Sequence, residues 1–144
     1  DGRFKKEFKS LLKENKIIHK TTLIGNIDID KIPSIATYAN SLFLSLRDDE
    51  IFTKTVPAKL QTYLALCKPI IGVLRGEGAT IIKDSNCGLV EENYNYVELA
   101  KKINLFANKH ESELFELGKN GKTYYDNHFN SELRKQEILK IIYE

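Results

Sequence analysis

Short apolar runs alternate with amphipathic segments along this chain, and polar residues gather at the joints between them. Residues 3–14 carry apolar side chains at helical spacing, which predicts an amphipathic helix. The run TLIGNI, Thr22–Ile27, is short and apolar and ends in a Gly-Asn pair before its last residue. It therefore predicts a buried strand that leads into a loop.

Three further apolar runs, at residues 41–46, 69–74 and 87–90, also predict buried strands. The middle run, PIIGVL, is apolar on both faces, as a central strand of a parallel sheet is. Proline positions and apolar spacing predict helices between these strands. Their core-facing residues are Ile32, Ile35, Ala36 and Ala39 after a cap at Asp30, then Leu60, Tyr63, Leu64 and Cys67, and then Ile81 and Ile82.

The last third of the chain predicts three helices, near residues 95–108, 110–127 and 131–143. The final helix carries four apolar side chains that we expect to face inward. These are Leu133, Ile138, Ile141 and Ile142.

Strands that alternate with helices at this spacing indicate βαβ units, so the predicted fold is α/β with a doubly wound parallel sheet. Such sheets bind ligands where the carboxyl ends of the strands meet the starts of helices. The length of 144 residues suits one core, and we predict a single domain over 1–144. Because the sequence begins with Asp1 rather than Met, we also expect a fragment of a longer protein.

Composition narrows the function classes without naming one. The net charge of +2 is too small to favour nucleic acid, and the lysines of the first twenty residues are expected to form a solvated helix face. No apolar run reaches the roughly 20 residues that a membrane span needs. Cys67 and Cys87 lie in apolar surroundings, and we expect both to be reduced, as in a cytosolic protein.

The common catalytic motifs are missing from this sequence. It contains no Gly-x-Ser-x-Gly elbow, no phosphate loop and no Gly-x-Gly-x-x-Gly after a strand. The histidines, His19, His110 and His128, stand far apart and are expected at the surface. Asp48 to Glu50 are consecutive acids that more often solvate a loop than bind a cation, so we predict no metal site.

A candidate anion site lies at the loop-to-helix junction EIFTKTVPAKL. Pro57 suits the first position of a helix, which leaves the amide groups around Val56 to Lys59 without partners inside the helix. The helix dipole and the ammonium groups of Lys54 and Lys59 would attract a diphosphate there. A capped helix with two solvated lysines explains the same residues equally well. The turn Gly76-Glu77-Gly78 follows the next strand and could approach the same ligand.

The order of these motifs resembles that of a known family. The stretch VPAKLQTYLALCKPIIGVLRGEGATIIKDSNCGLV is similar to the carboxyl-terminal half of family-four glycosyltransferases of the GT-B fold. The likeness is strongest to the bacterial branch that builds surface polysaccharide such as lipopolysaccharide, and it extends from about Gly2 to Lys102. It implies a Rossmann-like half of a GT-B fold, truncated at its amino end.

This resemblance implies a donor-binding domain of a retaining enzyme. The intact protein would transfer a hexosyl or N-acetylhexosaminyl group from a nucleotide-diphosphate sugar, UDP- or GDP-linked, to a lipid-linked or glycan acceptor. It would need no cofactor and no nucleic acid, would work in the cytoplasm or peripherally at the inner membrane, and would pair with an amino-terminal acceptor domain of the same chain. Without that domain the fragment alone is expected to be inactive.

The resemblance also assigns roles to residues, with no certain catalytic group in this fragment. Many relatives have two glutamates where this chain has Lys54 and Thr62, a departure we attribute to the subfamily. By this assignment Gly25, Asn26 and Ile27 contact the base, Thr62 the ribose, Glu50 and Thr53 the sugar, and Lys54, Thr55, Val56, Lys59, Gly76 and Glu77 the diphosphate.

The same sequence features also fit one alternative function. The same elements would suit a non-catalytic nucleotide-binding module on a flavodoxin-like α/β scaffold, which would not require phosphate-binding lysines at a helix start. The orientation of Lys54 and Lys59 relative to the carboxyl edge of the sheet separates the two interpretations.

Overall fold

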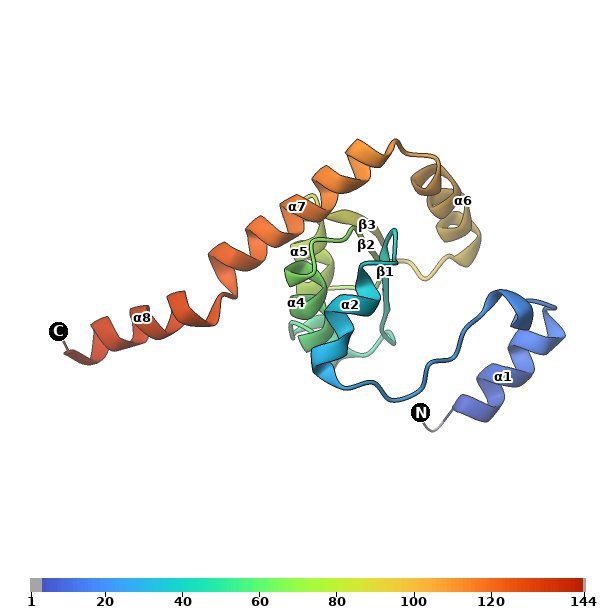
Figure 1. Ribbon diagram of the computed structural model, residues 1–144, viewed down its shortest axis with the longest axis horizontal. Helices are drawn as coiled ribbons and strands as arrows, with labels where there is room; N and C mark the ends of the chain where they lie inside the picture. Colours follow the sequence, from blue (N-terminus) through green and yellow to red (C-terminus); the bar gives the residue numbers. More distant parts are fainter. Residues whose placement is uncertain (1–3, 144) are drawn as a thin grey trace. The chain divides into compact units, whose positions relative to one another are not determined.

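A computed structural model describes residues 4–143 of the chain (Figure 1). The chain divides into two compact units, Asp1–Ile35 and Ala36–Glu144, and each is described here by itself. Gly2, where the family resemblance begins, lies outside the described residues. The assignment of 1–144 to one carboxyl-terminal domain stays a prediction.

The first unit is mainly helical. It contains α1 (Lys5–Glu14), the short 3-10 turns η1 (Ile18–Lys20) and η2 (Ile29–Lys31), and most of α2 (Ile32–Ala36). The amphipathic helix predicted for residues 3–14 is therefore confirmed over its described part. Leu12 is buried on its apolar side, whereas Phe8 and Leu11 are each 48% exposed.

The prediction of a strand at Thr22–Ile27 is wrong, because this segment forms a loop. Leu23 and Ile24 are 38% and 58% exposed, so the apolar run is not buried among the described residues. A strand forms when a neighbouring strand pairs with its backbone, and the structure records no such partner for this segment. Gly25, with φ 83°, also interrupts the extended backbone.

The helix expected after residue 30 forms as α2, with a different start. Asp28, not Asp30, occupies the cap position of η2, and its side chain makes no capping hydrogen bond. The expected core face is confirmed only in part, since α2 ends at Ala36 and Ala39 lies beyond it. Ala36 is 6% exposed, and the other three members, Ile32, Ile35 and Ala39, are half-buried.

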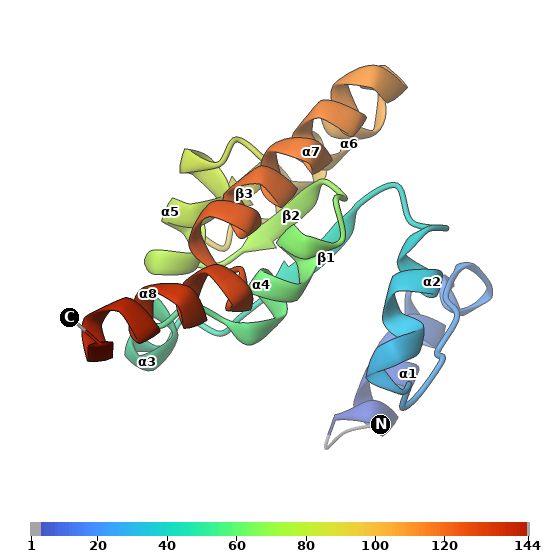
Figure 2. The ribbon, with the colours of Figure 1, turned by 60° about the vertical axis from the view of Figure 1, so that its left-hand side comes forward.

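The second unit is built on a parallel sheet of three strands in the order β1-β2-β3, as Figure 2 shows. They are β1 (Leu42–Ser45), β2 (Ile70–Val73) and β3 (Gly88–Glu91). Leu42 of β1 pairs in register with Ile70 of β2, which in turn pairs with Gly88 of β3. All three strands lie in runs that the sequence predicts to be strands, and the central position of β2 agrees with its four buried residues.

Helices connect the strands and complete the unit. The first connection contains α3 (Glu50–Thr53) and α4 (Ala58–Ala65), and the second contains α5 (Glu77–Asp84). The three carboxyl-terminal helices match their predicted ranges closely. They are α6 (Tyr96–Ala107), α7 (Glu111–His128) and α8 (Ser131–Tyr143).

Helices pack on both faces of the sheet, as the predicted α/β fold with a parallel sheet requires. On one face, side chains of α4 and α5 surround Leu44 and Ile70 in a core whose interior members are fully buried. On the other face, α6 covers Ile71 and Val73. The predicted helix faces are confirmed here, since Leu60, Leu64, Ile81 and Ile82 are 6% exposed or less.

Helix α7 lies against this core at two glycines. A Cβ atom added to Gly118 would lie 2.4 Å from the carbonyl oxygen of Cys67 at the end of α4. One added to Gly121 would lie 3.1 Å from the Cβ of Cys87. Neither cysteine forms a disulfide, as predicted, and burial raises the pKa of the Cys87 thiol.

Helix α8 continues from α7 and leads away from the sheet (Figure 1). It has no buried residue, so the expectation that its apolar side chains face inward is wrong. Its apolar residues have no described element to pack on. Leu133, Ile138, Ile141 and Ile142 are 43–79% exposed.

Candidate donor-binding edge

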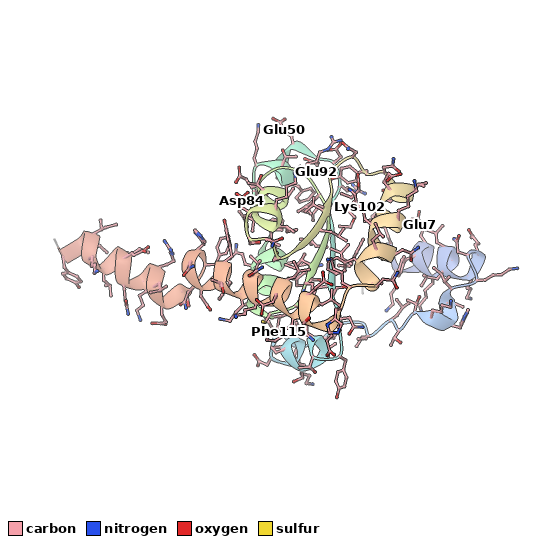
Figure 3. All side chains as sticks on the ribbon, turned by 90° about the horizontal axis from the view of Figure 1, so that it is seen from above. Glu7, Glu50, Asp84, Glu92, Lys102 and Phe115 are labelled. Atoms are coloured by element: carbon pink, nitrogen blue, oxygen red, sulfur yellow. The ribbon has the colours of Figure 1, made fainter. Side chains whose placement is uncertain are left out.

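The carboxyl ends of the three parallel strands lie along one edge of the sheet, called here the carboxyl edge. Two connections that carry predicted site residues start there: the β1 loop, residues 46–57, and the β2 turn, residues 75–78. Figure 3 shows Glu50 and Glu92 at this end of the sheet and Phe115 at the opposite end. The edge is the place where a sheet of this type binds its ligand.

The β1 loop is organised around the short helix α3. The carboxylate of Asp49 caps this helix, because its Oδ1 accepts a hydrogen bond of 2.9 Å from the amide of Ile51. Two hydroxyls of the loop bond to the same helix. Thr53 Oγ1 donates to the carbonyl of Glu50 at 2.8 Å, and Thr55 Oγ1 donates to that of Ile51 at 2.9 Å. Both hydroxyls retain free lone pairs, so toward a ligand they would act as acceptors.

Two residues predicted to contact the donor pair with each other instead. The ammonium group of Lys54 bonds to Oε1 of Glu50 one helical turn earlier, and the two side chains are 71% and 78% exposed. The sequence assigns one to the diphosphate and the other to the sugar. The pair places both at the carboxyl edge and offsets their charges.

The start of α4 offers donors without partners. The sequence predicted Pro57 as the first residue of this helix. In the structure Pro57 is instead the residue directly before it. Its carbonyl accepts from the amides of Leu60 and Gln61 at 2.9 and 3.4 Å. The amides of Ala58 and Lys59 have no acceptor among the described residues, as expected for a first helical turn.

Lys59 itself makes no ion pair with any described residue, whereas Lys54, Arg75, Lys83 and Lys102 do. Val56 is half-buried and packs against the core, so it contributes shape rather than charge. Thr62 lies three residues after Lys59, on the same side of α4. Its hydroxyl donates to the carbonyl of Ala58 at 3.3 Å.

The β2 turn lies directly against the β1 loop. Gly76 has φ 73°, and a Cβ atom there would lie 2.0 Å from the carbonyl oxygen of Thr53. A Cβ atom on Gly78 would lie 3.3 Å from the ring of Pro57. The structure thus brings together the two segments that the sequence assigns to the diphosphate. Glu77 is exposed at the first position of α5.

Arg75 is a residue at this edge that the sequence reasoning missed. Its Nη1 donates to Oδ2 of Asp48 at 2.8 Å, and its Nε donates to the carbonyl of Glu92 at 2.5 Å. Its guanidinium also lies 5.5 Å from the centre of the Tyr94 ring. The signal for this role is an arginine placed just after a fully apolar strand, at the edge where the neighbouring strands end.

A second ion pair anchors the end of β3. Glu91 is 3% exposed and accepts a 2.5 Å hydrogen bond from the ammonium group of Lys102 in α6. This hydrogen bond is the main reason why the pKa of Glu91 lies below its ordinary value. Lys83 of α5 pairs with the next residue, Glu92.

The predicted base-binding residues belong to the first unit. Gly25, Asn26 and Ile27 form part of the loop described above, in which Gly25 and Asn26 are exposed and Ile27 is half-buried. Their role stays a prediction, because this loop and the carboxyl edge belong to different units.

Parallel strands, helices on both faces and loops gathered at one edge define a Rossmann-like α/β domain with a ligand-binding edge. The family described as Glycosyl transferases group 1 matches residues 1–124, so the chain belongs to this glycosyltransferase family. No helix among residues 4–143 is long and apolar enough to cross a membrane.

The fold agrees with a solved structure. Sucrose-phosphate synthase from Thermosynechococcus elongatus matches with a TM-score of 0.75 and 19% identity, over 96% of this chain and 34% of that one. The likeness establishes the fold as one half of a GT-B architecture. The chain spans about a third of the length of that relative. A search of curated proteins finds no match.

Proposed function

We propose that this chain is the donor-binding half of a retaining glycosyltransferase that uses a nucleotide-diphosphate sugar. Family membership supports the reaction class. The observation that carries the donor assignment is the start of α4. There, two amides and the ammonium of Lys59, all without a partner among residues 4–143, lie beside the segment that packs against the glycine turn.

The proposed chemistry is electrostatic. When the sugar leaves, negative charge develops on the diphosphate, and preorganised donors stabilise it without the need to reorient. The amides of Ala58 and Lys59 and the ammonium of Lys59 supply such donors. Thr53 and Glu50 would contact the sugar, and Thr62 would contact the ribose in place of the usual glutamate. No cofactor beyond the UDP- or GDP-linked sugar is required by this proposal.

The acceptor side belongs to the parent protein. We infer a lipid-linked or glycan acceptor in surface polysaccharide synthesis, held by an amino-terminal domain and reached in the cytoplasm or at the inner face of the membrane. The support for this finer assignment is the resemblance of the Pro57–Pro69 stretch to that branch.

A titration of the chain with UDP, GDP and their sugar conjugates, followed by NMR, tests the donor assignment. We expect one nucleotide to bind saturably and the Lys59→Ala variant to bind about tenfold more weakly, as for loss of one charge-assisted contact. The matched control is Lys119→Ala, an exposed lysine beside Gly118, which contacts the opposite end of α4. If Lys59→Ala and Lys119→Ala bind alike, the donor site lies elsewhere.

The non-catalytic nucleotide-binding module is the second candidate. The observation that favours it is the pairing of Lys54 with Glu50, because this pair offsets the charge of one of the two lysines assigned to the leaving diphosphate. Sugar transfer by the parent protein separates the two functions. A parent that binds the nucleotide sugar but neither transfers nor hydrolyses the sugar would support the module.

A further inference from the structure

We propose that Arg75 is a positioning residue, which holds the β1 loop in its donor-binding place by joining the ends of all three strands. This inference rests on the proposed function for the identity of the ligand. Its mechanical part concerns the described contacts alone and is tested separately.

The contacts of Arg75 run in two directions from the end of the central strand. Nη1 reaches Asp48, at the start of the β1 loop, and Nε reaches the carbonyl of Glu92, after β3. Different nitrogens of one planar group make the two bonds, so the fork fixes the distance between the two loops. A single ammonium group cannot reproduce this geometry.

The strand that precedes Arg75 is the most deeply buried of the three strands. Each residue of β2 is buried, and Leu74, directly before Arg75, is 1% exposed. The backbone of Arg75 is therefore anchored in the core through the residues directly before it. The β1 loop is held at one end by Asp48 through this arginine and at the other by Thr53 against Gly76.

The loop after β3 is shaped to receive the arginine. Tyr94 adopts φ 53°, a conformation that a tyrosine rarely takes and that costs free energy. In this conformation its ring lies under the guanidinium of Arg75. The cation–π contact and the bond to Glu92 stabilise the same position of the side chain.

The charge of Arg75 is already used in this arrangement. Asp48, the carbonyl of Glu92 and the ring of Tyr94 contact the guanidinium, and the Arg75 side chain as a whole is 42% exposed. Arg75 thus differs from Lys59, which makes no ion pair with a described residue. We assign Lys59 to the diphosphate and Arg75 to the frame that holds the β1 loop.

Amide hydrogen exchange of the full chain tests the mechanical part without a ligand. The amides of Phe52 and Thr53 donate to the carbonyl of Asp49 and report on the β1 loop. We expect Arg75→Gln to raise their exchange rates about three- to tenfold while the amide of Ile70, inside the sheet, is unchanged. Lys83→Gln is the matched control, because it removes a cation that contacts Glu92 but not the β1 loop.

Equal exchange of the β1 loop in Arg75→Gln and Lys83→Gln would overturn the proposal. Asp48→Asn provides the same test from the other partner, on a side chain that is 50% exposed, and we expect it to raise the same exchange rates. It keeps the test decisive if Arg75→Gln does not fold.

Nucleotide affinity of the Asp48→Asn variant then separates a positioning role of Arg75 from direct contact with phosphate, because the two roles predict opposite changes in affinity. If Arg75 positions the loop, Asp48→Asn weakens binding of UDP or GDP about three- to tenfold, because the loop loses its tether. If Arg75 were itself a phosphate ligand, Asp48→Asn would free its charge and tighten binding, and the proposal would be wrong. Failure of the unmodified chain to bind any nucleotide would overturn the proposed function and leave the exchange result to decide the role of Arg75.

Discussion

The β1 loop and the β2 turn lie side by side at the carboxyl edge, but different forces hold them. The β2 turn is held by close packing at two glycines. A Cβ atom on Gly76 would collide with the backbone of Thr53, and one on Gly78 would press on the side chains of Leu74 and Pro57. The β1 loop is held by polar contacts of exposed side chains, such as the pair Glu50–Lys54. Close packing tolerates little change, whereas exposed ion pairs contribute little and are screened by salt. A donor bound at this edge would therefore contact a rigid wall, the β2 turn, and an adjustable wall, the β1 loop.

The largest expected effect is that of Gly76→Ala in the rigid wall. The added methyl group would lie 2.0 Å from the carbonyl oxygen of Thr53, at a φ of 73° that alanine rarely adopts. We expect unfolding free energy to fall by about 2–4 kcal/mol in thermal or urea unfolding. Gly25→Ala is the control, because Gly25 also has a positive φ but nothing within 4 Å of an added Cβ atom. Equal losses in both variants would mean that backbone strain alone, and not contact with the β1 loop, holds the turn.

The second effect is a pH dependence at the end of β3, where a buried carboxylate anchors the edge. Its hydrogen bond from Lys102 lowers the pKa of Glu91 in the folded protein. The charged form is thus favoured by folding, so its contribution is complete above the ordinary value of 4.5 and is lost as the pH falls through the lowered folded value. We expect Glu91→Gln to reduce stability at pH 7 and to flatten the loss of stability below pH 4.5.

Glu113→Gln is the comparison for this measurement, since the pKa of Glu113 is also lowered by a lysine, Lys109, but its side chain is 54% exposed. Solvent screens such a pair, and we expect a smaller change in the pH profile. Superimposable profiles of stability against pH for the two variants would show that burial of Glu91 does not strengthen its pH-dependent contribution to stability.

A third, smaller effect is expected within the adjustable wall itself. Asp49→Ala removes the cap of α3 and should cost about 0.5–1 kcal/mol of unfolding free energy. The change should be concentrated in the β1 loop, as faster exchange of the amide of Ile51. Asp28→Ala is the control, because Asp28 occupies the cap position of η2 without a side-chain cap bond. A cap contribution is absent if both variants unfold at the same urea concentration.

The smallest expected effect on stability is that of Glu50→Gln. The pair with Lys54 is exposed at both ends, so stability should change by no more than about 0.5 kcal/mol. Nucleotide binding should instead tighten about two- to threefold, because the ammonium of Lys54 loses its internal partner. Glu116→Gln, from the exposed pair with Lys119, should change neither quantity. Weaker binding of UDP or GDP without an attached sugar in Glu50→Gln would indicate that Glu50 contacts the nucleotide itself rather than the sugar alone.

The sequence predicts the parts of this fold that depend on apolar spacing. The runs that form β1, β2 and β3 are short and buried, and Leu60 and Leu64 mark the inner face of α4 correctly. Apolar spacing failed for Thr22–Ile27 and for α8. An apolar run is buried only where another element covers it, and the pattern of one segment does not reveal its partner.

The sequence predicted which segments form the candidate site, but not which side chains in those segments contact one another. The proline before α4 and the glycines after β2 follow from local backbone chemistry, and the structure brings their segments together. The pairing of Lys54 with Glu50 and the two-way contacts of Arg75 depend on which side chains meet across neighbouring loops. Such meetings are set by the register of the sheet, which the sequence does not display.

The two glycines of α7 bear on how tolerance to substitution should be interpreted in this protein. A side chain at Gly118 or Gly121 would press against Cys67 or Cys87, on the part of the core away from the carboxyl edge. A saturation scan scored by cell growth would therefore mark Gly118 as intolerant, much like Gly76, and Gly121 as intolerant of larger side chains. An exposed residue that we propose to bind the donor, such as Lys59, would tolerate many replacements in a scan scored by abundance. The difference between the two scans, rather than intolerance in either, would mark the residues that handle the sugar nucleotide.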